Sequence, residues 1–308
     1  MARRTEELHV SQFQIYKPHY EVSVKWIIER ENIRRNRAMG KPAPWTKNEL
    51  MANTRWCNVR RMDDKVSIWL LENFYTNRRL APSEMAVGAS LARLINRPET
   101  LGLLCPKGYD GFHYKNLHVK LAQMAKAKQQ IFTGVYIING GGGGVAKWEA
   151  VLNNLRDMWN TISDEEVDTT SMQQTHYNLM QYRGLGSFIA GQVVADLRHI
   201  VKGTWSDKDT WAPQGPGSTR GLAYVLNVRP KDIKPSTWLE AFHVYTTALR
   251  NDARLKAIFA DRKLEAHDLQ NCLCETSKMA RLLAGGRSKN RYKASGDDAN
   301  QLSLWDMQ

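Results

Sequence analysis

The segment 182–199 carries the clearest chemical signal, because two glycines separate two predicted helices there. Gly184-Leu185-Gly186 makes a tight turn, and a second helix starts at once. Glycine permits positive φ and lets a phosphate approach backbone N–H groups closely. The free N–H groups and positive dipole end of the second helix then face that phosphate. The pattern predicts a helix-hairpin-helix over 171–199 that binds the DNA backbone through Gly184, Gly186 and Ser187. An ordinary corner between two helices is the alternative.

Two aspartates follow the hairpin, and each is a candidate catalytic acid or base. Asp196 lies within the second helix, and Asp209 follows that helix. A carboxylate beside a substrate can take or give a proton. The competing interpretations are a salt bridge of Asp196 with Arg198 or with a neighbouring helix, and a capping or turn role for Asp209. The sequence does not rank one aspartate above the other.

A second possible anion-binding loop begins at Gly215. Pro216 fixes the turn, Ser218 is placed to cap the next helix, and Arg220 lies in the first turn of that helix. Backbone N–H groups and an arginine at a helix start suit a phosphate or pyrophosphate. This predicts phosphate contacts at Gly215, Gly217 and Arg220, with a plain capped turn as the alternative.

The last predicted helix, 264–284, has a polar face. Asp268, Asn271, Glu275 and Lys278 recur at helical spacing and therefore share one side. Glu275 is a candidate acid, base or amine-binding group that lines a pocket. The alternative is a solvated face with an internal Glu275–Lys278 pair, which would contribute little.

Helical periodicity accounts for most of the chain, so we expect an all-α fold with at most a minor extended segment near 132–139. The glycine run that follows, 140–144, lacks the Gly-Lys-Ser/Thr spacing of a P-loop. We expect an N-terminal arm (1–20), one two-lobed helical domain (21–284) and a basic, polar tail (285–308). The predicted helices cover 21–39, a stretch from a Thr46/Glu49 capping box to about 75, 83–96, 113–130, 147–159, 171–182, 186–199, 218–226, 236–249 and 264–284.

Charge and composition point to a polyanionic partner. The chain carries 44 basic and 31 acidic residues, a net charge of +13, which favours double-stranded DNA. The sequence contains no apolar run long enough to span a bilayer, and it shows no signal peptide. We therefore expect no membrane association and an intracellular location. The four cysteines form no Cys-x-x-Cys pair, and we expect no metal site.

Several short motifs together resemble a helical family of phage thymine-hypermodification systems, the 5-hydroxymethyluracil-DNA kinase helical domain or α-glutamyl/putrescinyl-thymine pyrophosphorylase clade. Its marks are Glu29-Arg30, Pro44-Trp45-Thr46, Trp56-Cys57-Asn58-Val59 with Arg61, Gly184 to Phe188, Val194 to His199, Gly215-Pro216-Gly217, and Leu273-Cys274-Glu275 with Lys278. The chain departs from the family pattern at Glu31, Lys47 and Arg60, where a histidine, an aspartate and an aromatic residue are usual. The resemblance implies a fold related to helix-hairpin-helix DNA glycosylases and a location in the host cytoplasm.

The resemblance also implies chemistry on DNA that carries 5-hydroxymethyluracil. One branch of the family is linked to phosphorylating the hydroxymethyl group, and the other to replacing its (pyro)phosphate with an amine. Because the chain has no P-loop, we expect amine transfer, with an amino acid or putrescine as co-substrate and no other cofactor. A separate DNA-base kinase is a candidate partner. The alternatives are a kinase-associated helical domain, a DNA glycosylase and a non-catalytic DNA-binding module.

In the transfer hypothesis the base is flipped out of the stack into a pocket. Asp196, Asp209 or Glu275 takes a proton from the amine, and Trp45, Trp56 or Trp211 stacks on the base. The residues expected to hold the substrate or its phosphates are Asn58, Arg61, Arg198, His199, Arg220 and Lys278.

Overall fold

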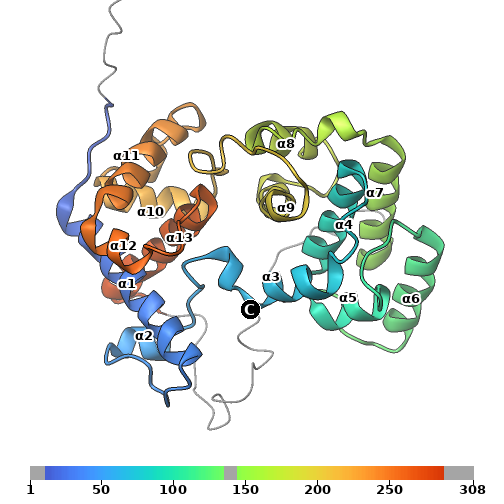
Figure 1. Ribbon diagram of the computed structural model, residues 1–308, viewed down its shortest axis with the longest axis horizontal. Helices are drawn as coiled ribbons and strands as arrows, with labels where there is room; N and C mark the ends of the chain where they lie inside the picture. The colour runs from blue at the N-terminus through green and yellow to red at the C-terminus, as the bar shows by residue number, and fades with distance from the viewer. Residues whose placement is uncertain (1–10, 135–143, 288–308) are drawn as a thin grey trace, which may run out of the picture. The chain divides into compact units, whose positions relative to one another are not determined.

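The computed structural model describes residues 11–134 and 144–287 (Figure 1). Within these ranges the regular structure comprises thirteen α-helices and a few short 3-10 or π turns, with no β-strand. The all-α prediction is therefore confirmed. Of the predicted extended segment near 132–139, residues 132–134 form no strand, and the rest lies outside the described ranges, as do residues 140–143 of the glycine run and most of the tail. None of the described helices is long and apolar enough to cross a membrane.

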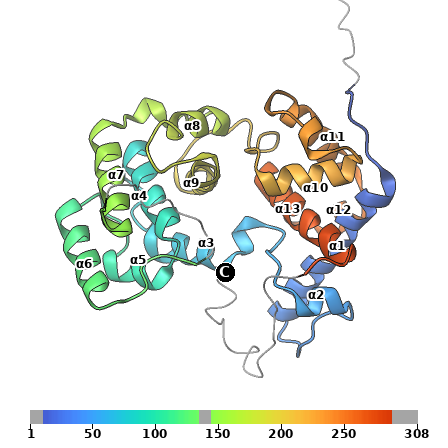
Figure 2. The ribbon, with the colours of Figure 1, turned by 180° about the vertical axis from the view of Figure 1, so that it is seen from behind.

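The described chain divides into two compact units. Unit 1 comprises 11–59, 216–264 and 268–287, and unit 2 comprises 60–134, 144–215 and 265–267. Unit 1 contains α1 (Lys17–Ala38), α2 (Glu49–Asn53), η4 (Pro230–Asp232), η5 (Pro235–Thr237), α10 (Pro216–Leu226), α11 (Trp238–Asn251), α12 (Ala253–Ile258) and most of α13 (Ala266–Leu283). Both views show α10 beside α11 and α13 (Figures 1 and 2).

The core of unit 1 combines apolar packing with a buried chain of hydroxyls. Ser23 Oγ lies 2.8 Å from Tyr245 Oη and 2.9 Å from Thr276 Oγ1, which links α1, α11 and α13. Gly221 lets α10 approach α13 closely, because a Cβ at this position would lie 1.9 Å from the carbonyl oxygen of Leu273. Any larger residue would therefore separate the two helices.

Unit 2 is built around one buried helix. Its elements are η1 (Arg61–Asp63), α3 (Lys65–Trp69), the π-helical turn η2 (Leu70–Phe74), α4 (Pro82–Ile95), α5 (Pro98–Leu104), α6 (Tyr114–Lys126), α7 (Lys147–Thr161), η3 (Asp164–Glu166), α8 (Met172–Leu179) and α9 (Ser187–Ile200). Every residue of α4 from Met85 to Ile95 is buried. A helix buried on all sides must be covered by several neighbours, and α9 and α7 pack along it (Figure 1).

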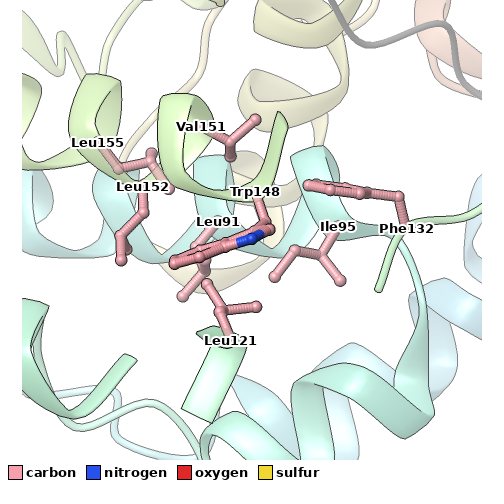
Figure 3. Close-up of a pocket in the computed structure, with 8 residues that line it drawn as sticks. All are labelled: Leu91, Ile95, Leu121, Phe132, Trp148, Val151, Leu152 and Leu155. Atoms are coloured by element: carbon pink, nitrogen blue, oxygen red, sulfur yellow. The ribbon is translucent and has the colours of Figure 1, made fainter. Parts of the chain in front are cut away.

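The core between α4, α6 and α7 holds an apolar pocket. Its lining residues are Leu91, Ile95, Leu121, Phe132, Trp148, Val151, Leu152 and Leu155 (Figure 3). The Trp148 ring lies among the leucines, and Lys147 Nζ is 4.7 Å from the centre of the Phe132 ring. Because aliphatic and aromatic groups line this pocket, it is part of the core of unit 2 and provides little polar chemistry for orienting a substrate.

Three serine or threonine residues that open predicted helices, Thr46, Ser83 and Ser218, are not the N-caps of these helices. The helix expected at Thr46 begins at Glu49, because Asn48 Oδ1 caps it by accepting from the Met51 N–H at 3.1 Å. Thr46 instead donates its hydroxyl to Glu29. The 83–96 helix begins at Pro82, with Ala81 rather than a serine at the N-cap.

The third wrong cap concerns Ser218, which does not cap α10. That helix already begins at Pro216, and Ser218 is fully buried with its Oγ accepting from Gln270 Nε2 at 3.1 Å. The short helices α5 and α12 were not predicted. Pro98, which lies just beyond the end of the predicted 83–96 helix, is the first residue of α5, a position where a missing N–H costs nothing.

Candidate functional site

The turn between α8 and α9 is exposed at its two glycines, and a buried leucine and a hydrogen bond hold it against the rest of unit 2. Gly184 has φ of +92°, which only glycine adopts without strain, and Gly184 and Gly186 are exposed. Leu185 between them is 2% exposed and packs into the core. His176 Nε2 lies 2.9 Å from the carbonyl oxygen of Ser187 and donates to it, which ties α8 to the first residue of α9. The turn therefore has a fixed base and an open outer side.

The start of α9 is suited to an external acceptor. The N-cap residue of α9, Gly186, has no side chain that could cap the helix, and a Cβ built on Gly186 would meet nothing within 4 Å. The first-turn N–H groups of a helix need acceptors from outside the helix, and an anion supplies them. The start of α8 differs, because Asp207 accepts from the Met172 N–H at 2.8 Å and the Gln173 N–H at 2.9 Å. Sequence reasoning missed this cap, which lies 35 residues away.

Asp196, a predicted catalytic residue, lies at the centre of a buried ion network. Its Oδ1 accepts from Arg61 at 2.9 Å and Arg93 at 2.6 Å, and its Oδ2 accepts from Tyr75 at 2.7 Å and Arg93 at 2.6 Å. Burial opposes the charge, but the two guanidinium groups outweigh it and lower the pKa of Asp196 to about 2. Four donors occupy both carboxylate oxygens. The geometry therefore favours a structural role for Asp196 over a role as proton acceptor. This agrees with the alternative in which Asp196 forms a salt bridge with a neighbouring helix.

Three other predicted residues of unit 2, Arg61, Arg198 and Asp209, are also engaged. Arg61 additionally donates to the side chain and the carbonyl of Gln192. Arg198 pairs with Glu265 at 2.8 Å, and Asp209 pairs with Lys208 at 2.6 Å while half-buried. His199 is exposed at the end of α9. A substrate phosphate would have to compete with the carboxylate partners of Arg61 and Arg198.

Trp211 and two histidines form an aromatic cluster in the same unit. Trp211 is 6% exposed, and its ring centre lies 5.1 Å from that of His176 and 5.7 Å from that of His267. Trp211 is therefore a core residue and not a platform for a base. Burial, with Arg61 and the other histidines, lowers the pKa of His267 to about 3, against a small opposing effect of the Gly191 backbone. His267 was missed because its neighbours are distant in sequence.

Unit 1 brings together three of the segments on which the resemblance rests. Arg30 on α1 donates to the carbonyl of Cys57 at 2.9 Å and to Asn58 Oδ1 at 2.5 Å. Asn271 on α13 donates to the carbonyl of Asn58 at 3.1 Å. The loop 54–58 is thus held between α1 and α13 by polar contacts, which places Asn58 beside the polar face of α13.

Glu275 and Lys278 complete this cluster. Glu275 is 7% exposed, and Lys278 Nζ lies 3.3 Å from its Oε2. The same ammonium donates to the carbonyl of Arg55 and lies 4.4 Å from the centre of the Trp56 ring. The predicted Glu275–Lys278 pair is present, but it is half-buried rather than solvated. A carboxylate, an ammonium and an indole ring meet here, a set that can bind a polar ligand and move a proton.

The residues around α10 have different surroundings. Packing accounts for the glycine at 217, because a Cβ there would lie 3.2 Å from Cys274 Sγ; the DNA contact predicted for it and for Gly215 stays a prediction. Arg220 is exposed, and no ion pair involves it among the described residues.

Glu31 is one of the positions at which the chain departs from the family pattern. Burial raises the pKa of its carboxyl, but the hydrogen bonds from Arg34 and Arg35 outweigh burial and lower the pKa.

The fold is that of an all-helical domain with an exposed glycine hairpin and a polar cluster. The chain belongs to the family described as "5-hmdU DNA kinase, helical domain", whose model matches residues 17–287. It is 23% identical to the 5-hmdU DNA kinase of Bacillus phage SP10 over 90% of this chain and 48% of the relative. The chain thus spans about half the length of this curated relative. No solved structure matches, so the relation to helix-hairpin-helix glycosylases stays a prediction.

Asp196→Ala should destabilise the protein strongly, because it leaves Arg93, 2% exposed, without its carboxylate. Removing one partner of a buried ion pair costs about 3–5 kcal/mol. Chemical denaturation monitored by circular dichroism measures the loss. Asp157→Ala is the control and should cost about 1 kcal/mol or less, since its pair with Arg156 is exposed. An Asp196→Ala protein as stable as the wild type would contradict the anchor role.

The protein should lose stability as the pH falls below 6.5, partly through His267. The unfolded histidine takes up a proton near its ordinary pKa of 6.5, whereas the folded one resists protonation down to about 3. The free energy of unfolding should therefore fall by about 1.4 kcal/mol per pH unit for this residue. Denaturation at pH 7, 6 and 5 measures the slope, and His267→Phe should reduce it. If the pH dependence of the free energy of unfolding were the same in His267→Phe as in the wild type, His267 would take up its proton at an ordinary pKa in the folded protein.

Proposed function

We propose that this chain is a DNA-binding helical part of a system that modifies 5-hydroxymethyluracil in DNA, and that the α8–α9 turn binds the sugar-phosphate backbone. The observation that carries this proposal is the open space around Gly186, the N-cap residue of α9, which supplies no capping side chain. A phosphate oxygen that approaches the first turn of α9 meets no Cβ at position 186. The family description supplies the kind of DNA.

The charge of the chain supports the same partner. A net charge of +13 attracts a polyanion and makes its binding dependent on salt. A helix-hairpin-helix contact reads the backbone and not the base sequence. We therefore expect binding to duplex DNA of any sequence, with the modified base recognised elsewhere in the protein.

Phosphorylation of the base requires a nucleotide-binding segment, of which the P-loop is one kind, and the sequence of 308 residues contains no P-loop motif. The relative from phage SP10 is named a kinase and is about twice as long as the matching stretch. We propose that a DNA-base kinase, fused or separate, phosphorylates the hydroxymethyl group while this chain engages the DNA.

Gly186→Asp should separate DNA binding from folding. Aspartate at an N-cap accepts from first-turn N–H groups and stabilises the helix, and its Cβ meets nothing within 4 Å. The same carboxylate would occupy the proposed phosphate position and repel the backbone. We expect an unchanged or higher melting temperature and DNA binding weakened at least about 10-fold at 100 mM salt. Fluorescence anisotropy with a labelled duplex measures the affinity.

The control for this variant makes the same change of charge elsewhere. Gln123 is exposed on α6 of the same unit, so Gln123→Glu should retain binding within about twofold, the loss expected from one distant charge. An equal loss of DNA affinity in both variants would show that the effect comes from net charge alone. Unchanged DNA affinity in Gly186→Asp would show that the α8–α9 turn does not contact DNA.

A second candidate function, amine transfer, is favoured by the unit 1 cluster of Glu275, Lys278 and Trp56. In this reaction the amine nitrogen attacks the methylene carbon attached to C5 of the base. The bond from that carbon to the (pyro)phosphate oxygen breaks, and the electron pair leaves with the (pyro)phosphate. Glu275 takes the proton that the amine loses, and Arg220, also in unit 1 and exposed, is proposed to bind the leaving group.

Amine transfer predicts a base of increased mass in an intact strand. DNA with 5-hydroxymethyluracil or its phosphorylated forms is incubated with the chain and an amino acid or putrescine, then digested and analysed by nucleoside mass spectrometry. Glu275→Gln should lower product formation at least about 100-fold, the usual contribution of a general base. A released free base would instead show a glycosylase, and DNA binding with no product would show a binding module.

A further inference from the structure

Two tryptophans of unit 1 have buried indole N–H groups that meet no acceptor among the described residues. One is Nε1 of Trp26, a side chain that is 1% exposed, and the other is Nε1 of the half-buried Trp56. A third indole of this unit is satisfied, because Trp45 Nε1 donates to the carbonyl of Lys41 at 2.7 Å. Since buried donors in proteins are normally paired, the first two indoles point to an acceptor that the chain itself does not supply.

The two indoles belong to one cluster. The ring centres of Trp26 and Trp56 lie 6.0 Å apart, with an angle of 56° between the ring planes. Lys278 Nζ lies over the face of Trp56, 4.4 Å from the ring centre. An indole N–H points outward in the plane of its ring, and an ammonium has no acceptor to offer it. The contact with Lys278 therefore leaves the N–H of Trp56 in need of an acceptor.

The backbone acceptors of this cluster already serve charged donors. The carbonyl of Cys57 accepts from Arg30 at 2.9 Å, and the carbonyl of Arg55 accepts from Lys278. Glu275 provides a carboxylate; it is 7% exposed and lies 3.3 Å from Lys278 Nζ. One carboxylate does not balance the charge of two guanidinium groups and an ammonium. The cluster thus combines unpaired indole donors with an excess of positive charge.

We infer that this cluster binds a small ligand through an anionic oxygen, of a carboxylate or a phosphate, which accepts the indole N–H groups of Trp26 and Trp56. An anion supplies the missing acceptor and compensates the positive charge at once, whereas a neutral ligand leaves the charge and a cationic one adds to it. The inference goes beyond the proposed function. It concerns binding alone, and it holds whether or not the cluster transfers an amine or the α8–α9 turn binds DNA.

Nuclear magnetic resonance of the indole N–H groups tests this binding directly. The full chain with isotopically labelled tryptophan is titrated with inorganic phosphate, glycine or putrescine at constant ionic strength, and Trp26→Phe and Trp56→Phe assign the two resonances. Phosphate or glycine should move both resonances downfield, because a hydrogen bond to an anion deshields the proton, and the anion that acts identifies the source. Putrescine should move neither. Trp45 and Trp205, whose N–H groups already donate to carbonyls, should keep their positions.

Trp56→Phe removes one N–H group and keeps an aromatic ring beside Lys278. It should weaken binding of the active anion about 10-fold or more, the contribution of a hydrogen bond to a charged group. Trp45→Phe is the matched control and should bind as the wild type, because the N–H that it removes already donates to Lys41.

Three results would overturn the inference and leave the proposed DNA contact intact. The first is that neither resonance of the wild type moves with phosphate or glycine at about 10 mM, well above a weak Kd of about 1 mM. The second is that putrescine moves the Trp26 and Trp56 resonances as much as the anions do. The third is undiminished anion binding by Trp56→Phe that circular dichroism shows to be folded, because the ligand would then bind without this donor.

Discussion

The position of the α8–α9 hairpin depends on one buried carboxylate. Asp196 on α9 is held by Arg93 from α4, by Arg61 from η1 and by Tyr75 just after η2. A buried charge is tolerated only when its partners satisfy it fully, and all four acceptor positions of Asp196 are used. These hydrogen bonds therefore fix the register in which α9 packs against α4. That register determines where the exposed turn at the start of α9 lies on unit 2.

The same requirement explains why the chemistry of this chain is to be sought away from Asp196. A carboxylate that must accept four hydrogen bonds to be stable cannot also accept a proton in a reaction without disrupting the core. Glu275 has fewer partners: among the described contacts it pairs with Lys278 at 3.3 Å. That cluster in unit 1 joins the loop 54–58 to α1 and α13, and it is the better place to look for acid–base chemistry.

Much of this fold follows from local sequence patterns. The long helices were predictable because apolar residues recur at helical spacing, and the turn at Gly184 was predictable because only glycine fits its positive φ. The Glu275–Lys278 pair followed from their separation of three residues on one helix. The remaining elements depend on distant contacts. Asp207 caps α8 from 35 residues away, and Arg93 reaches Asp196 across 103 residues.

Where local reasoning failed, a competing contact decided the outcome. Thr46 has the sequence of a helix cap but hydrogen-bonds to Glu29 on α1, so Asn48 caps the helix in its place. Trp211 has the character of a stacking residue but fills the space between His176 and His267. No property of either segment alone reveals these partners, because both arise when helices distant in sequence pack together.

The central claim is that the first turn of α9 binds a DNA phosphate, and amide hydrogen exchange tests it most directly. The first turn of α9 has no capping side chain from its N-cap Gly186, and its N–H groups should exchange faster in the free protein than those of the buried helix α4. Saturation with duplex DNA containing 5-hydroxymethyluracil should slow exchange in this turn, while the amides of the buried helix α4 stay unchanged. Protection confined to other segments, with the start of α9 exchanging as fast as before, would contradict the account.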